Sequence, residues 1–147
     1  MNILSKIRGK HMAAKLNCCS DEGCKLNLAG CRNYVILKGE LINSSIAICD
    51  CMIFFANAAF TVAIIELRSK SIDVEKIKKK MENGTSEAKK ILDQCGIKDF
   101  ELYLILLAKG YSGSVIQRIK GTKIKIEGKT HRIIAKRCGN KFTDIVI

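Results

Sequence analysis

The most apolar part of the chain spans residues 41–65. Within it, β-branched and aromatic residues gather at 46–55 and at 60–67, and the short stretch between these runs contains Asn57, a residue that tolerates the left-handed backbone of a tight turn. Both alternating sets of side chains are mostly apolar in each run, which is typical of strands buried on both faces. The pattern therefore predicts a hairpin of two buried strands.

A membrane-spanning helix is the alternative for residues 41–65, because their length would cross a bilayer. Asp50 would then lie near the middle of the membrane, where a charged side chain costs about 2.5–3.5 kcal/mol on insertion scales. Asn43 and Asn57 would add to that cost. We therefore expect no stable membrane insertion.

Elsewhere the pattern predicts helices interleaved with strands. Helical spacing and capping residues predict helices at 3–16, 73–81, 85–95 and 114–120. Gly84 is expected to separate the second of these helices from the third. Further strands are predicted at 34–37, 101–108, 123–127 and 130–136, the last two joined as a hairpin across Gly128. Residues 17–31 are expected to be loop, and the whole predicts an α/β fold in which helices flank a mixed β-sheet.

Composition and charge narrow the classes of function. The 147 residues suit one domain at 34–147, ending in a basic hairpin and preceded by a basic, cysteine-containing segment at 1–33. A hydrophobic fraction of 48% excludes global disorder. Lys and Arg number 26 against 14 Asp and Glu, and a net charge of +12 predicts a polyanionic partner: nucleic acid first, an anionic membrane surface second. A merely solvated basic surface is the alternative, and an aromatic fraction of 5% disfavours binding by base stacking.

Two acidic residues, Asp50 and Glu66, lie within the apolar runs. A turn centred near Ala58 pairs residues whose numbers sum to about 116, so these two carboxylates would face each other with Cβ atoms about 4.5–5.5 Å apart. Facing carboxylates between apolar strands repel each other and are costly to bury unpaired. Mg²⁺ or Mn²⁺ would offset that cost directly. The alternative is a register shifted by one residue, with one carboxylate at a strand end in water.

Asp50, the two apolar strands and then Glu66-Leu67-Arg68 resemble the D…(D/E)-x-K signature of the PD-(D/E)XK nuclease superfamily. The helix expected after residue 73 follows where that superfamily places a helix against its sheet. The tail at 124–139 is also similar to the end of small microbial proteins that carry such a core. The resemblance covers roughly residues 34–140 and implies a restriction-endonuclease-like core.

The resemblance also implies roles for these residues. Asp50 and Glu66 would hold one or two Mg²⁺ ions, with Glu40 as a third acidic ligand and the backbone carbonyl of Leu67 as the remaining one. Arg68 stands where the superfamily has Lys; it keeps the positive charge that stabilises the transferring phosphate, but its guanidinium cannot act as a base. The implied function is a metal-dependent nuclease that acts on DNA, with RNA second, and a homodimer is compatible with it. The alternative is a catalytically weak or inactive nucleic-acid-binding protein of the same fold.

Basic residues able to contact a phosphate backbone lie within or near several of the predicted strands. Lys123 and Lys125 share one face of the last hairpin, which lies in the densest basic region of the chain. The predicted nucleic-acid contacts are Lys70, Lys76, Lys120, Lys123, Lys125, Arg132, Lys136 and Arg137.

The eight cysteines follow no secretory signal, so we expect a cytoplasmic protein with free thiols. Cys49 and Cys51 flank Asp50 and are expected to fill the core on the sheet face opposite the carboxylate. A zinc or iron–sulfur site, and with it a metal- or redox-sensing function, is the alternative for a group of four cysteines near the N-terminus, because the spacing Cys19-x₄-Cys24 fits half of a zinc pattern. The four are Cys18, Cys19, Cys24 and Cys31.

Overall fold

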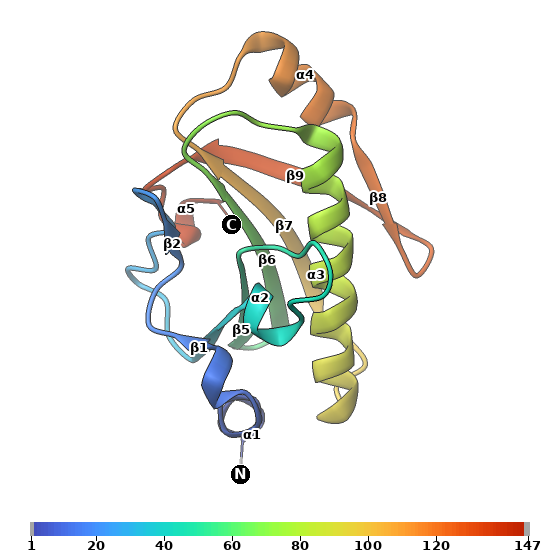
Figure 1. The fold of residues 1–147 in the computed structure, drawn as a ribbon. Helices are drawn as coiled ribbons and strands as arrows, with labels where there is room; N and C mark the ends of the chain where they lie inside the picture. The colour runs from blue at the N-terminus through green and yellow to red at the C-terminus, as the bar shows by residue number, and fades with distance from the viewer. Residues whose placement is uncertain (1, 146–147) are drawn as a thin grey trace.

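A seven-stranded mixed sheet is the centre of the computed structural model, which describes residues 2–145 (Figure 1). Its spatial order is β1-β4-β5-β6-β7-β9-β8. These strands are β1 (Lys15–Leu16), β4 (Tyr34–Lys38), β5 (Cys51–Ala56), β6 (Phe60–Arg68), β7 (Glu101–Ala108), β8 (Lys123–Ile126) and β9 (Lys129–Arg137). A separate pair consists of β2 (Ser20–Asp21) and β3 (Cys24–Lys25). The predicted α/β class, a mixed sheet flanked by helices, is confirmed.

Helices lie between the strands and at both ends of the described chain. They are α1 (Ile3–Lys10), the 3₁₀ turn η1 (Met12–Ala14), α2 (Gly39–Ile42), α3 (Val74–Gln94), α4 (Gly113–Gly121) and α5 (Phe142–Ile145). The N-terminal helix ends earlier than predicted, at Lys10, because the chain turns through η1 to pair β1 with β4. None of the helices within residues 2–145 is long and apolar enough to cross a membrane.

Strand direction brings several chain ends to one edge of the sheet. β4, β5 and β6 pair antiparallel, whereas β6, β7 and β9 pair parallel. The carboxyl ends of β4, β6, β7 and β9 therefore meet at one edge, together with the start of β5. We call this the carboxyl edge; its strand-end positions are Lys38, Asp50, Arg68, Ala108 and Arg137.

Each face of the sheet carries its own apolar core. On one face, called here the α3 face, side chains such as Met52, Phe54 and Ile64 pack with α1 and α3. On the opposite face the core contains Ile53 and Ile65 and is covered by the segment around β2 and β3 and by α5 (Figure 1). Both faces of the central hairpin are thus buried, as its doubly apolar pattern predicts.

The register of the central hairpin is the predicted one. Cys51 pairs with Ile65 and Ala56 with Phe60, and both pairs of numbers sum to 116. The first strand nevertheless begins at Cys51 rather than at residue 46. The residues before it bond elsewhere, since Asn43 accepts the backbone N–H of Ser45 and Asn83 of α3 donates to the carbonyl of Ala47.

Helix α3 runs without interruption through Gly84, so the predicted break into two helices is wrong. Gly84 is buried where the helix crosses the sheet: a Cβ built on it would lie 2.5 Å from Cys49 Sγ and 3.2 Å from Ile64 Cγ2. The glycine thus allows close packing of the helix and does not end it. Thr85, the predicted cap of a second helix, is buried within α3, where its hydroxyl donates to the carbonyl of Met81 at 2.8 Å.

The N-terminal segment, expected to be loop with free thiols, is bound to the sheet by two disulfides. Cys19 pairs with Cys51 and Cys24 with Cys138, across Cα separations of 6.1 and 5.0 Å. The prediction of free thiols is therefore wrong for these four residues. The spacing of the cysteines along the sequence could not have revealed these pairs, because the partners are 32 and 114 residues apart and only the fold brings them together.

Substitution Gly84→Ala is expected to lower the free energy of unfolding by about 1–3 kcal/mol, because the added methyl overpacks a filled core. Helix propensity alone predicts the opposite sign. The matched control is Gly9→Ala in α1, where nothing lies within 4 Å of the added Cβ, and we expect it to stabilise by about 0.5–1 kcal/mol. Urea denaturation measures both; a stabilised Gly84→Ala protein would contradict the packing described here.

Thiol titration tests the disulfides. The unreduced chain, unfolded in denaturant, is expected to expose four reactive thiols, those of Cys18, Cys31, Cys49 and Cys95. Reduction before titration should raise the count to eight. Eight thiols without reduction would show that the two pairs do not form.

Candidate active site

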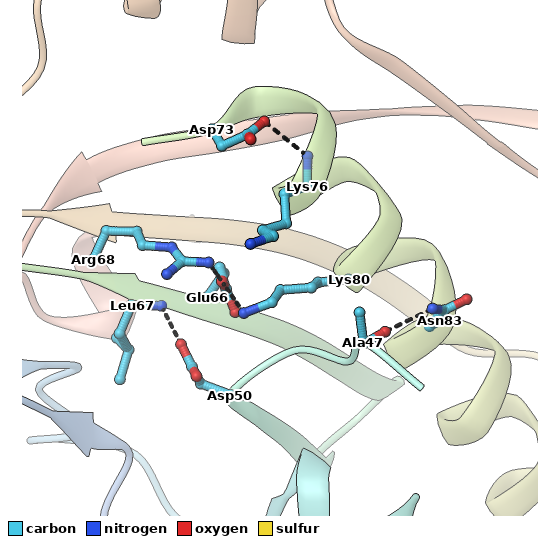
Figure 2. A network of polar contacts seen from close by, with 9 residues as sticks. All are labelled: Ala47, Asp50, Glu66, Leu67, Arg68, Asp73, Lys76, Lys80 and Asn83. Atoms are coloured by element: carbon cyan, nitrogen blue, oxygen red, sulfur yellow. Dashed lines mark hydrogen bonds and ion pairs between the residues drawn. The ribbon is translucent and has the colours of Figure 1, made fainter. Parts of the chain in front are cut away.

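The two carboxylates predicted to face each other meet at the carboxyl edge. Asp50 directly precedes β5 and Glu66 lies two residues before the end of β6. Extending the pair Cys51 with Ile65 by one residue sets Asp50 opposite Glu66. The backbone N–H of Leu67 donates to Asp50 Oδ2 at 2.7 Å, which fixes one oxygen of this carboxylate (Figure 2).

Glu66 is a buried charged residue with a half-satisfied carboxylate. Its side chain has 0% exposure, and Oε2 forms an ion pair with Arg68 Nη2 at 2.6 Å and accepts a hydrogen bond from Lys80 Nζ at 3.3 Å. Its other oxygen, Oε1, is buried without a hydrogen-bond partner. Burial raises the pKa of Glu66 to about 7, the negative charge of Asp50 adds to the rise, and Arg68 and Lys80 oppose it. An unpartnered buried oxygen of this kind indicates that a proton or a cation completes the site.

Sequence reasoning missed Lys80. It comes from α3, and Figure 2 shows its side chain reaching from the helix to the carboxylate of Glu66. A signal was available: Lys80 lies three residues after Ile77 and four before Gly84, so it shares the helix side that faces the sheet. Because a break was predicted at Gly84, the side of the helix that Ile77, Lys80 and Gly84 share was not recognised.

Arg68 and Lys76 complete the cationic surroundings. The Arg68 side chain is 27% exposed, and its Nε is buried without a partner. Lys76 is exposed on the first turn of α3, which Asp73 caps by accepting the Lys76 backbone N–H at 3.2 Å. Figure 2 shows the Lys76 side chain extending toward Arg68 and Glu66. Two cations, Arg68 and Lys80, thus contact the buried acid, and Lys76 extends toward them from α3.

Glu40, predicted as a third acidic ligand, lies nearby but does not join the pair. It is in α2, its side chain is 64% exposed, and it forms an ion pair with Lys38 at 2.9 Å. Glu40 and Asp50 line the same cavity of about 340 Å³, together with Lys80 and with Asp21 from the N-terminal segment. Glu66 is not among the lining residues, so a cation would reach it past Asp50 and Lys80.

The donor set fits a hard divalent cation with a small number of protein ligands. Asp50 and Glu66 would supply carboxylate oxygens, the type of ligand that Mg²⁺ and Mn²⁺ prefer. The Leu67 carbonyl points to the same side of β6 as its N–H, which is the side of β5. Among residues 2–145, no group of three or more His, Cys, Asp or Glu side chains is arranged to hold a metal. Mg²⁺ accepts such a site because it keeps several of its waters.

The predicted nucleic-acid contacts fall into separate groups. Lys70 and Arg137 lie at the carboxyl edge and Lys76 above it on α3, whereas Lys136, next to Arg137, belongs to the opposite face by strand alternation. The remaining four lie around β8, at the far edge of the sheet. These are Lys120, Lys123, Lys125 and Arg132.

The cysteines predicted as an alternative metal site are not gathered at one point. Cys19 and Cys24 are held in disulfides with different partners, Cys18 is exposed and Cys31 is half-buried. Cys51 lies in the core of the face opposite Asp50, as predicted, although bonded to Cys19. Cys49 packs on the α3 face, so the prediction for its side is wrong. Strand alternation does not reach Cys49, since β5 begins only at Cys51.

The protonation of Glu66 should appear in the pH dependence of stability. A folded-state pKa of about 7, above the ordinary value, means that the folded protein binds more protons than the unfolded chain between about pH 5 and 7. The free energy of unfolding of the wild type, measured in EDTA and relative to Glu66→Gln, is therefore expected to fall as pH rises through this window. Both proteins keep His11, whose lowered pKa acts in the opposite direction, so their difference isolates Glu66. Parallel curves would contradict the raised pKa.

Comparisons of the chain with protein-family models, with curated proteins and with solved structures find no match.

Proposed function

We propose that the protein is a metal-dependent nuclease that hydrolyses phosphodiester bonds in DNA, with RNA as the second candidate. The observation that carries the proposal is the buried carboxylate of Glu66, which faces Asp50, keeps one oxygen without a partner and is flanked by Arg68 and Lys80. A purely structural carboxylate would have both oxygens satisfied, because an unpaired buried acceptor costs about 1–3 kcal/mol.

The resemblance to the PD-(D/E)XK superfamily supports the same function. Asp50 directly precedes β5, and Glu66-Leu67-Arg68 end the neighbouring antiparallel strand β6, in the predicted register. Helix α3 follows β6 and packs against the sheet, as the resemblance leads one to expect. A restriction-endonuclease-like core is therefore part of the proposal.

In this proposal the chain's own groups position the reaction. Asp50, Glu66 and the Leu67 carbonyl would hold the metal. A bound Mg²⁺ or Mn²⁺ supplies polarisation of the phosphate and a lowered pKa of the attacking water. Arg68 and Lys80 would stabilise the negative charge that develops on the phosphate oxygens. Lys80 supplies, from α3, the lysine side chain that the motif has at the position of Arg68.

The alternative is a catalytically weak or inactive nucleic-acid-binding protein with the same fold. Two observations favour it: Arg68 replaces the Lys of the motif, and the two cations Arg68 and Lys80 already neutralise the charge of Glu66. A metal would have to displace part of these contacts to reach the carboxylate. Activity with Mg²⁺ or Mn²⁺ separates the two functions.

The decisive assay incubates plasmid and single-stranded DNA and RNA with the oxidised protein in Mg²⁺ or Mn²⁺. We expect cleavage by the wild type and a loss of about 100-fold or more in Asp50→Asn and Glu66→Gln, because each removes a charged metal ligand. The matched control is Asp99→Asn, a change of the same chemistry at an exposed position distant from the site, and it should cleave like the wild type. Circular dichroism verifies that each variant is folded.

Two outcomes would contradict the proposal. Equal cleavage by Asp50→Asn and the wild type would mean that the activity lies elsewhere. Salt-sensitive binding without cleavage in either metal would favour the inactive binding protein.

A further inference from the structure

Basic residues form a row along the carboxyl edge, beginning at the candidate active site. Arg137 ends β9, Lys109 directly follows β7, and Lys70 lies two residues beyond β6. Lys25 joins the row from β3, because its carbonyl accepts the N–H of Gly139 at 2.7 Å. We call Lys25, Lys70, Lys109 and Arg137 the edge cations.

The sheet register aligns this row with the site. Arg68 pairs with Ala108 and Ala108 with Arg137, so the two arginines lie on one line across three strands. Both belong to the α3 face, the face that carries Glu66, by alternation from Ile64 and Ile133. Neighbouring strands are about 4.8 Å apart, which sets the Arg68 and Arg137 backbones roughly 10 Å apart. The strand position between them is Ala108, and the hydroxyl of Tyr111 donates nearby to the carbonyls of Leu106 and Lys136.

The backbone under the row is held in place. Lys109 N–H donates to the carbonyl of Arg68 at 3.2 Å, and Cys138 N–H donates to that of Ala108 at 3.0 Å, so the ladder continues past the strand ends. The disulfide between Cys24 and Cys138 ties β3 to the end of β9. Cations on a fixed backbone lose little freedom on binding, which favours affinity.

The charges of the row are free to act on a ligand. Within residues 2–145, none of the four edge cations takes part in an ion pair, and all four are exposed. The acidic residues closest in sequence to Lys25 are Asp21 and Glu22 of the β2–β3 turn. Glu22 already accepts a hydrogen bond from the hydroxyl of Ser69 at 3.1 Å. Alternation from Leu107 sets Lys109 on the face opposite Glu66, and a Cβ built on Gly23 would lie 3.3 Å from Lys109 Nζ, so this cation lies against the β2–β3 turn. The row therefore presents positive charge on both faces of the carboxyl edge, with Arg137 on the face that carries Glu66.

The basic hairpin of β8 and β9 has a different explanation. Lys123 and Lys125 are exposed on β8, the outermost strand, while Ile124 between them is buried. Lysines on an edge strand prevent pairing with other chains, which accounts for them without a ligand. Arg132 donates to the carbonyl of Lys120 at 2.7 Å, and Glu127 in the turn is paired with Lys89 of α3. Strand β8 also lies three strands away from β6.

We propose that the edge cations form the nucleic-acid-binding surface and lead a sugar–phosphate backbone to Asp50 and Glu66, whereas β8 and the turn that joins it to β9 do not contact it. The proposal rests on the proposed function for the class of ligand. Contact is to phosphates and not to bases, since no aromatic side chain among residues 2–145 is exposed for stacking. Binding should accordingly be independent of sequence and strongly dependent on salt.

The test compares two double variants that remove the same charge: Lys109→Gln with Arg137→Gln, and Lys123→Gln with Lys125→Gln. Fluorescence anisotropy measures the binding of labelled 30-nucleotide single- and double-stranded DNA, in EDTA so that no cleavage occurs. We expect the edge variant to bind about tenfold more weakly. On duplex DNA, the slope of the logarithm of the association constant against the logarithm of salt concentration should become less steep by about 1.8. The hairpin variant should stay within about twofold of the wild type, a margin that covers the change in net charge.

Equal weakening of both variants, a larger effect in the hairpin variant, or no binding by the wild type would overturn the proposal. All four substituted side chains are exposed, and Lys70→Gln, beyond the end of β6, serves as a single-site check should the edge variant fold poorly. Failure of the proposed function is distinguishable: edge-dependent binding without cleavage in Mg²⁺ refutes the nuclease and keeps the surface. Cleavage that the edge variant retains in full, with unchanged binding, refutes the surface and keeps the nuclease.

Discussion

Antiparallel pairing of β5 with β6 is the interaction on which the site depends. It sets Asp50 opposite Glu66 at the point where the hairpin reaches the carboxyl edge. A register shift of one residue would move one of the carboxylates to the other sheet face, because side chains alternate along a strand. The short turn between Ala56 and Phe60 fixes this register, and the packing of the two cores holds the strands in place.

The cost of burying Glu66 is offset at only one of its two carboxylate oxygens. Arg68 and Lys80 compensate one oxygen, whereas the other has no partner among the described residues. A buried acid with two cationic neighbours contributes little to the stability of a fold, since a protein with well-packed apolar side chains in their place is often equally or more stable. The arrangement is instead typical of a site that exchanges a proton or a cation.

The sequence pattern was sufficient for local features and for the hairpin. The interleaving of helical and strand patterns predicted the α/β class, and the turn near Ala58 predicted the pairing of Asp50 with Glu66. It was insufficient where a long-range contact decides the structure. Gly84 resembles a helix breaker until Cys49 is known to pack against it, and Lys80 resembles any exposed lysine until α3 is known to be continuous. The two disulfides likewise join residues that only the folded sheet brings together.

The most direct test of the central claim is a crystal structure of the oxidised protein soaked in Mn²⁺, with anomalous data collected to locate the ion. The account predicts one Mn²⁺ bonded to carboxylate oxygens of both Asp50 and Glu66, at about 2.0–2.2 Å, and no ion at this position in Glu66→Gln. An empty site, with Glu66 still bonded to Arg68 and Lys80 at saturating Mn²⁺, would contradict it.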